Sequence, residues 1–127
     1  MLSFEGFSIC TTMSYNVDLP FLPERPSQPR EKGVTMMMDK GLSIKQAEEF
    51  LQASGPYTDI IKLGFGTSVI TPNLKEKVKL YHSAGMKVYL GGTLFEAFLV
   101  RGKFEDYIRF AKGLGLETAE VSDGSII

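Results

Sequence analysis

An alternation of short apolar segments with amphipathic segments constrains the fold more than any other feature of the chain. Strand-like segments begin near residues 33, 57, 86 and 116, so their starts lie about 25–30 residues apart. Helical patterns fill the intervals at residues 42–55, 71–85 and 94–115, and we expect the last of these to break near Gly102. This order predicts a parallel sheet that is joined by right-handed crossovers and covered by helices on both faces.

Two α/β architectures satisfy this alternation, a doubly wound open sheet and a (β/α)8 barrel. No G-x-G-x-x-G sequence follows the first strand, which disfavours a dinucleotide-binding fold. Ser43 is expected to cap the first helix, and Thr71 with Pro72 to start the second. The buried face of the second helix is expected to carry Leu74, Val78 and Tyr81.

The composition excludes several classes of protein. The chain has 127 residues, of which 43% are apolar, enough for the core of one domain. With 14 basic and 15 acidic residues, a nucleic-acid partner is not expected. Single cysteine and histidine residues, Cys10 and His82, exclude a disulfide framework and a Cys or His metal cluster. The start lacks a signal-peptide pattern and no apolar run approaches the roughly 18 residues of a membrane span, so we expect a cytoplasmic protein with no membrane partner.

Residues 1–32 differ from the rest of the chain in composition. Prolines at positions 20, 23, 26 and 29 exclude a helix or a central strand there. We therefore divide the chain into an extended, proline-rich arm at 1–32 and a β/α domain at 33–127. Residues 1–20 are expected to have no helix or strand of their own. The side chains that could pack the arm against the domain are Leu19, Phe21 and Leu22.

Charged or hydroxyl-bearing residues stand beside glycine at the carboxyl end of every strand-like segment. In parallel α/β folds these ends meet at one edge of the sheet, where ligands bind. Glycine lets backbone N–H groups approach an anion, lysine adds positive charge, and carboxylates suit a hard cation such as Mg2+. The pattern predicts a site for a small, multiply charged anion. We assign catalytic roles to Lys40, Lys62 and Glu120, substrate binding to Gly64, Gly66, Thr67, Ser68, Gly91, Gly92, Thr93 and Ser122, and Mg2+ binding to Glu96 and Asp123.

These residues also have structural explanations. A glycine after a strand is common in turns, and Asp39 or Asp123 could cap a turn or a helix. Lys62 could line the sheet as one half of an ion pair with Glu120. Recurrence at all four strand ends favours a binding site, since independent turns need not each carry a charge or a hydroxyl.

The blocks GVTMMMDKGLS, YTDIIKLGFGTSVI, KVYLGGTLFEAF and GLETAEVSDGSI resemble successive blocks of the phosphosulfolactate synthase family. The resemblance covers about residues 30–127. The family includes archaeal enzymes of coenzyme M biosynthesis and bacterial relatives of the sulfolactate pathway, with diverged plant heat-stress-associated proteins as more distant relatives. The motifs DKG, GFGTS, GGTLFE and SDG are intact here, which favours the enzymes over the plant proteins.

The resemblance implies a (β/α)8 barrel in which Mg2+ assists the addition of sulfite to phosphoenolpyruvate, giving phosphosulfolactate. A complete barrel needs about 250 residues, and the family's later E-V-G-x-K block, whose lysine is the proposed proton donor, is absent from the sequence. We therefore expect the first half of a lyase, with about four of the barrel strands, that is inactive alone and assembles into homo-oligomers. Two alternatives stay open: a non-catalytic barrel relative, and another phosphate-binding lyase or aldolase with a Schiff-base lysine.

Overall fold

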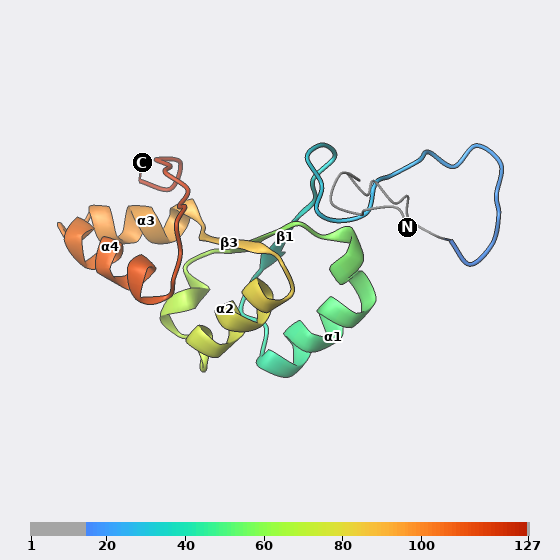
Figure 1. The fold of residues 1–127 in the computed structure, drawn as a ribbon. Coiled ribbons are helices and arrows are strands. Elements are labelled where there is room, and N and C mark those ends of the chain that lie inside the picture. Colours follow the sequence, from blue (N-terminus) through green and yellow to red (C-terminus); the bar gives the residue numbers. More distant parts are fainter. Residues whose placement is uncertain (1–14, 127) are drawn as a thin grey trace, which may run out of the picture.

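The structure is a computed structural model, and it describes residues 15–126. Within these residues, strands and helices alternate along the chain (Figure 1). The elements are β1 (Met36–Asp39), α1 (Ile44–Ser54), η2 (Gly55–Tyr57), β2 (Ile60–Leu63), η3 (Thr67–Val69), α2 (Leu74–Ser83), β3 (Lys87–Leu90), α3 (Gly92–Leu99) and α4 (Phe104–Gly113). The predicted order of the first three strands and of the helices between them is confirmed.

The strands β1, β2 and β3 form one parallel sheet in that order. Successive side chains of a strand point to opposite faces, and Ile61, Leu63, Val88 and Leu90 are buried on one of them. Helices α1 and α2 lie together on one side of the sheet (Figure 1). Met36, whose side chain belongs to the other face, is 43% exposed. Among residues 15–126 the helices therefore cover one face of the sheet rather than both.

The predicted fourth strand at residues 116–125 is reduced to an isolated parallel bridge between Leu90 and Ala119. The Glu120 N–H donates to the Leu90 carbonyl at 3.1 Å, which brings the following residues beside the end of β3. A strand needs successive backbone pairs, whereas the Ser125 N–H donates to a side chain, the carboxylate of Glu96. The prediction was right about the position of this segment and wrong about its extent as a strand.

Local sequence signals explain where α1 begins. Ser43 Oγ accepts a hydrogen bond from the Gln46 N–H at 3.2 Å, and Gln46 Oε1 accepts one from the Ser43 N–H at 2.9 Å. This reciprocal arrangement is a capping box. The predicted N-cap at Ser43 is confirmed.

The start of α2 differs from the prediction. The helix begins at Leu74, after Asn73 in a left-handed conformation with φ of 55°. Thr71 does not cap it, because its Oγ1 donates to the Thr67 carbonyl at 2.7 Å and so belongs to the preceding 3-10 turn. The face predicted to be buried is confirmed, since Leu74, Val78 and Tyr81 are all at most 9% exposed.

The predicted break near Gly102 is confirmed, because α3 ends at Leu99 and α4 starts at Phe104. Gly102 itself has φ of 66°, a conformation that glycine adopts without strain. The two helices pack through aromatic rings, with Tyr107 of α4 5.7 Å from Phe95 and 5.6 Å from Phe98 between ring centres. None of the helices in residues 15–126 combines the length and the hydropathy that a bilayer-spanning helix needs.

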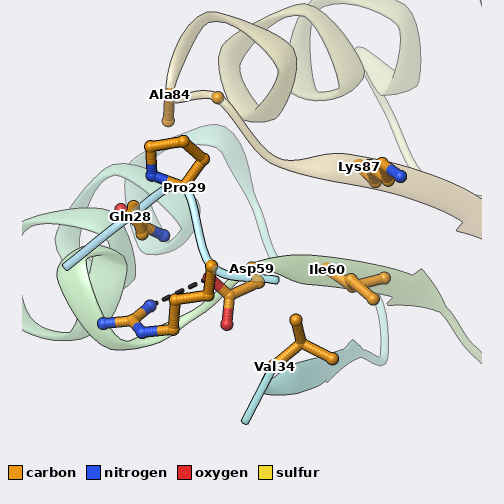
Figure 2. Close-up of a pocket in the computed structure, with 9 residues that line it drawn as sticks. Gln28, Pro29, Val34, Asp59, Ile60, Ala84 and Lys87 are labelled. Carbon is orange, nitrogen blue, oxygen red and sulfur yellow. Dashed lines mark hydrogen bonds and ion pairs between the residues drawn. The ribbon is translucent and has the colours of Figure 1, made fainter. Parts of the chain in front are cut away.

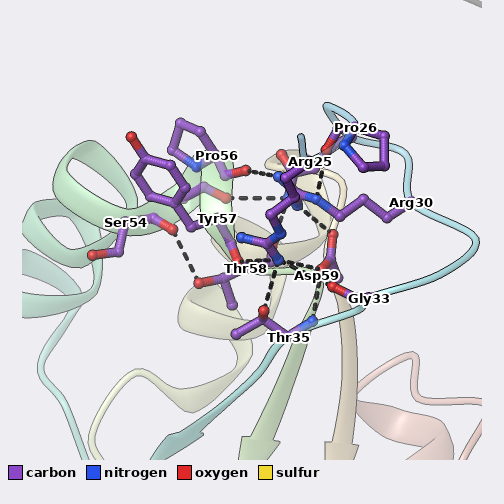
Figure 3. A network of polar contacts seen from close by, with 12 residues as sticks. Arg25, Pro26, Arg30, Gly33, Thr35, Ser54, Pro56, Tyr57, Thr58 and Asp59 are labelled. Carbon is purple, nitrogen blue, oxygen red and sulfur yellow. Dashed lines mark hydrogen bonds and ion pairs between the residues drawn. The ribbon is translucent and has the colours of Figure 1, made fainter. Parts of the chain in front are cut away.

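Polar contacts fix part of the arm to the amino end of the sheet (Figure 3). Arg30, with its side chain 0% exposed, donates through Nη1 to Asp59 Oδ1 at 2.8 Å and through Nη2 to the Pro56 carbonyl at 2.6 Å. Arg25 Nη2 donates to Thr35 Oγ1 at 2.7 Å. These arginines satisfy backbone carbonyls and a carboxylate where the strands begin.

The apolar residues predicted to attach the arm are exposed rather than buried against the domain. Leu19, Phe21 and Leu22 are 52%, 102% and 41% exposed. The prediction for residues 1–20 falls largely outside the described residues, and residues 15–20 contain no helix or strand. The division at residue 32 stays a prediction.

Candidate functional site

Lys62 and Glu120 form the centre of the candidate site. Lys62 Nζ lies 2.7 Å from Oε2 and 3.0 Å from Oε1 of Glu120. Lys62 stands on β2 and Glu120 follows the bridge at Ala119, so the contact joins distant segments at the carboxyl ends of the strands. The ion pair that sequence reasoning kept as an alternative is therefore present. The two side chains are 18% and 34% exposed, which leaves them accessible to a ligand.

The start of α3 contributes a third group to this pair. The Gly92 N–H, at the first residue of the helix, donates to Glu120 Oε1 at 3.1 Å. Unpaired N–H groups and the helix dipole favour negative charge at such a position. The hydrogen bond with Glu120 raises the pKa of Lys62 above its ordinary value. The hydrogen bond with Lys62, joined by the Gly92 N–H, lowers the pKa of Glu120 although burial acts the other way. Both groups are therefore charged at neutral pH, and together they show that this place stabilises a carboxylate.

Close packing at the start of α3 requires glycine. A Cβ on Gly92 would lie 2.7 Å from Ser122 Cβ and 2.9 Å from Glu120 Oε1, and a Cβ on Gly91 would lie 3.0 Å from Lys62 Cε. The Gly91 N–H donates to the Leu63 carbonyl at 2.9 Å. Both glycines thus let the chain's own side chains approach the helix start, and their contact with a substrate stays a prediction.

Glu96 holds the segment after Glu120 against α3. Its side chain lies one turn beyond Gly92 and the residue is 3% exposed. One carboxylate oxygen accepts from the Ser122 hydroxyl, and the other accepts from the Ser125 N–H at 2.8 Å. Glu96, Ser122 and the Lys62–Glu120 pair are therefore gathered at one end of the sheet, as predicted for them.

The residues assigned to Mg2+ do not by themselves fit a metal centre. Both oxygens of Glu96 accept hydrogen bonds from protein donors, and Asp123 is exposed. Within residues 15–126, no three side chains of His, Cys, Asp or Glu are placed to hold an ion together. A Mg2+ site requires oxygen ligands in octahedral geometry. Binding of Mg2+ by Glu96 and Asp123 stays a prediction.

Lys40 lies on a different turn, the one that follows β1. Its ammonium is 5.3 Å from the centre of the Phe65 ring, within the range of a cation–π contact. Phe65 is 62% exposed and has φ of 54°. The turns after β1 and β2 are therefore in contact. Among the described residues, no hydrogen bond or ion pair joins Lys40 to Lys62 or Glu120.

The glycine-rich turn after β2 makes mostly internal contacts. The Gly64 N–H donates to the Asp39 carbonyl at 2.8 Å, and Thr67 Oγ1 donates to the Gly64 carbonyl at 2.8 Å. Gly66 has φ of 72°, which makes glycine the favoured residue there. Ser68 is 5% exposed, and its hydroxyl has no hydrogen-bond partner in the described part of the chain. The substrate-binding roles of these residues, and of the exposed Thr93, stay predictions.

Sequence reasoning missed a buried polar cluster behind these turns. Asp39 faces the helix layer, where it contacts Lys77 and Tyr81 of α2, and all three residues are at most 1% exposed. Helical spacing could have located Lys77, since it falls on the same face of α2 as Leu74, Val78 and Tyr81.

A cavity of about 320 Å³ opens at the opposite, amino end of the sheet, beneath the arm (Figure 2). Arg30 and Asp59 in its wall pair with each other at 2.8 Å. The other residues that line it are Gln28, Pro29, Val34, Ile60, Ala84, Gly85 and Lys87, none of which belongs to the predicted site. This cavity and the Lys62–Glu120 pair thus lie at opposite ends of the strands.

Comparison with known families and proteins agrees with the motifs. The model of the ComA family, described as (2R)-phospho-3-sulfolactate synthase, matches residues 23–127. The chain belongs to this family. Among similar proteins are the phosphosulfolactate synthases of Methanocaldococcus jannaschii, 43% identical over 97 residues, and Methanothermobacter thermautotrophicus, 41% identical over 106 residues. The phosphosulfolactate synthase of Bacillus subtilis is 31% identical over 105 residues.

These matches cover 75%, 82% and 83% of the chain but 39%, 41% and 42% of the three synthases. The chain thus spans about two fifths of the length of the curated phosphosulfolactate synthases that it matches. The resemblance in the sequence motifs is confirmed.

Proposed function

We propose that this chain supplies an anion-binding part of a phosphosulfolactate synthase, an enzyme that adds sulfite to phosphoenolpyruvate. Family membership supports the reaction class. The observation that carries the proposal is the placement of Lys62 and the Gly92 N–H, which hold a carboxylate between them at an accessible edge of the sheet. A substrate carboxylate or phosphate presents the same kind of oxygen to these donors.

The chemistry requires a strongly cationic site, because both substrates are anions. A carbon–sulfur bond forms at the methylene carbon of phosphoenolpyruvate, and the electron pair of the double bond moves to the neighbouring carbon. That carbon shares its charge with the carboxylate until it takes up a proton, and no bond to phosphate breaks. Lys62 and the start of α3 would stabilise the developing charge, and Lys40 would add a second cation from the neighbouring turn.

The geometry bears on the alternative of a Schiff-base enzyme. An imine-forming lysine must lose its proton readily, but the hydrogen bond with Glu120 raises the pKa of Lys62. This disfavours Lys62 as such a nucleophile. In our proposal β1 to β3 and the segment at 119–126 form the first part of a (β/α)8 barrel, and Mg2+, a cytoplasmic location and homo-oligomers remain predictions.

A chimera tests the proposal. Residues 23–127 are joined to the part of the Methanocaldococcus jannaschii synthase that has no counterpart in this chain, and consumption of phosphoenolpyruvate is followed with and without sulfite. We expect sulfite-dependent consumption, with kcat/KM reduced roughly tenfold or more by Lys62→Ala and unchanged by Lys79→Ala, which removes the same charge from an exposed position of α2.

Consumption that is independent of sulfite, or a Lys62→Ala chimera with the original kcat/KM, would contradict the proposal. Calorimetric titration of the 127-residue chain with phosphoenolpyruvate provides a test that does not depend on the chimera. An absence of binding at concentrations up to roughly 10 mM would also contradict it.

A further inference from the structure

Asp39 lies at the carboxyl end of β1, but its side chain points away from the open face of the sheet. Oδ1 accepts hydrogen bonds from the N–H groups of Gly41 and Leu42, both at 2.8 Å. These contacts close a tight turn over residues 39–42. The residue is 1% exposed, so the turn is built on a buried carboxylate.

Two side chains of α2 bind this carboxylate from the helix-covered face of the sheet. Lys77 Nζ lies 2.9 Å from Oδ2 and 3.1 Å from Oδ1 of Asp39, and the Tyr81 hydroxyl donates to Oδ2 at 2.8 Å. Lys77 Nζ also donates to the Leu42 carbonyl at 2.7 Å. The same ammonium therefore contacts the first and the last residue of the turn. Lys77 is 1% exposed and Tyr81 is 0% exposed, so water does not compete for these contacts.

The turn that is fixed in this way presents Lys40. Gly41, next to it, has φ of 105°, and a Cβ there would lie 3.6 Å from Thr67 Cβ on the following loop. The Lys40 ammonium reaches the Phe65 ring of that loop, 5.3 Å from its centre. Contacts with α2 and with the turn after β2 thus fix the backbone on both sides of Lys40.

We infer that Lys77 and Tyr81 are positioning residues that act through Asp39 to place Lys40 at the anion-binding end of the sheet. This inference rests on the proposed function, in which Lys40 contacts a substrate anion. A buried ion pair is weak grounds for a role in stability alone, since apolar residues of similar volume often replace such a pair without loss. What apolar residues could not reproduce here are the hydrogen bonds from Lys77 to Leu42 and from Gly41 and Leu42 to Asp39. The cluster therefore specifies the path of the turn.

A double-mutant cycle tests the inference in the 127-residue chain. Tyr81→Phe removes one hydroxyl from the cluster while keeping the ring, and Lys40→Ala removes the positioned charge. We expect Tyr81→Phe to weaken phosphoenolpyruvate binding about 3- to 10-fold when Lys40 is present, and not to weaken it further in the Lys40→Ala background. Lys77→Met is expected to show the same dependence on Lys40 with a larger effect.

The outcomes separate this inference from the proposed function. Equal weakening by Tyr81→Phe in both backgrounds, or no weakening where Lys40→Ala has an effect, would overturn the positioning role. If Lys40→Ala itself leaves binding unchanged, the proposed role of Lys40 fails. Amide chemical shifts of residues 40–42 then test the turn without a ligand: displaced shifts in folded Tyr81→Phe protein support the positioning of the turn, and unchanged shifts overturn it.

Discussion

The two ends of the three-stranded sheet each hold an ion pair, yet the pairs differ in burial. At the amino end Arg30 meets Asp59 at 2.8 Å, with side chains 0% and 10% exposed. At the carboxyl end Lys62 meets Glu120 at 2.7 Å, with side chains 18% and 34% exposed. The Arg30–Asp59 pair is thus largely closed to solvent and the Lys62–Glu120 pair is open to it, while the Asp39–Lys77 pair at the carboxyl end is buried on the helix side of the sheet.

The partners of each cation explain the difference. Arg30 also donates to the backbone carbonyls of Pro26 and Pro56, so its guanidinium ties the arm to the loop before β2. Lys62 contacts a carboxylate that the Gly92 N–H also binds. A multidentate guanidinium in a buried place fastens segments together, whereas an accessible lysine beside a helix start can exchange one anion for another. In our proposal the amino end is therefore structural, and the carboxyl end binds the substrate anion.

The largest difference between the two ends is expected when the Arg30–Asp59 pair is broken. Arg30→Ala removes the ion-pair partner of Asp59 and the donor to the Pro26 and Pro56 carbonyls, while the Thr35 N–H still binds Asp59, and it should lower the free energy of unfolding by about 3 kcal/mol. Urea denaturation measures this change. Arg109→Ala is the control, since Arg109 pairs with Asp106 on the exposed face of α4, with side chains 73% and 42% exposed. Arg109→Ala should lower the free energy of unfolding by about 0–1 kcal/mol. An equal loss in Arg30→Ala and Arg109→Ala would contradict a structural role for the Arg30–Asp59 pair.

Lys62→Ala should affect binding more than stability. Loss of a charge-assisted contact with the substrate is expected to weaken phosphoenolpyruvate binding by about 1.5–3 kcal/mol, roughly 10- to 150-fold. The free energy of unfolding should fall by about 1 kcal/mol or less, because the pair with Glu120 is partly exposed. Calorimetric titration and urea denaturation of the same sample compare the two quantities. A loss of stability with unchanged affinity would make Lys62 a structural residue.

Gly92→Ala tests the packing at the start of α3. The added Cβ would meet Ser122 and Glu120, so the segment at 120–122 must shift, at a cost of about 1–3 kcal/mol in the free energy of unfolding. Gly113→Ala in α4 is the matched control, because nothing lies within 4 Å of its added Cβ. Thermal denaturation of both variants should separate them. Equal melting temperatures would show that the contact at Gly92 is not tight in solution.

The smallest expected effect is on the loss of stability at acid pH. Burial acts to raise the pKa of Asp59, but hydrogen bonds from the Thr35 N–H and from Arg30 outweigh it, so the pKa lies below its ordinary value. A carboxyl group with a lowered pKa stabilises the fold above its unfolded value, about 3.9 for Asp. That stability is lost as the pH falls below this value through the folded pKa. Asp59→Asn should therefore flatten the decline in stability below about pH 4.

Glu120→Gln provides the comparison for this pH dependence. The pKa of Glu120 is also lowered, first by its hydrogen bond with Lys62, so its contribution has the same sign. The Glu120 side chain is 34% exposed and that of Asp59 is 10% exposed, so solvent screens Glu120 more strongly. Glu120→Gln should therefore reduce the loss of stability at low pH less than Asp59→Asn does. Urea midpoints between about pH 3 and 6 measure both slopes. A steeper slope for Asp59→Asn than for the parent chain would contradict the sign.

Local patterns in the sequence were sufficient for the elements that depend on neighbouring residues. The N-cap at Ser43, the buried face of α2 and the break at Gly102 all follow from residues within about one or two helical turns. The sequence also indicated the Lys62–Glu120 pair as an alternative, because both residues stand at carboxyl ends of strand-like segments, and in parallel sheets these ends lie at one edge.

Two of the features that the sequence did not predict depend on contacts between distant segments, and one depends on a local contact that competes with helix capping. Asp39 and Lys77 are 38 residues apart, and Arg30 and Asp59 are 29 residues apart, so no local signal marks either pair. The start of α2 was misplaced because Thr71 bonds back to Thr67 rather than forward into the helix. Residues 116–125 were predicted as a fourth strand because strand-like segments recur along the chain, but they form one bridge at Ala119, and the Ser125 N–H donates to the Glu96 side chain.

In our proposal, anions bind at the carboxyl end of the sheet, whereas the amino end fastens the arm. Titration of the isotopically labelled chain with phosphoenolpyruvate, followed by backbone amide chemical shifts, tests it most directly. We predict concentration-dependent shifts at Lys62, Gly92 and Glu120, with Arg30 and Asp59 unchanged. Shifts confined to Arg30, Asp59 and the cavity beneath the arm, or no shifts at either end, would contradict the claim.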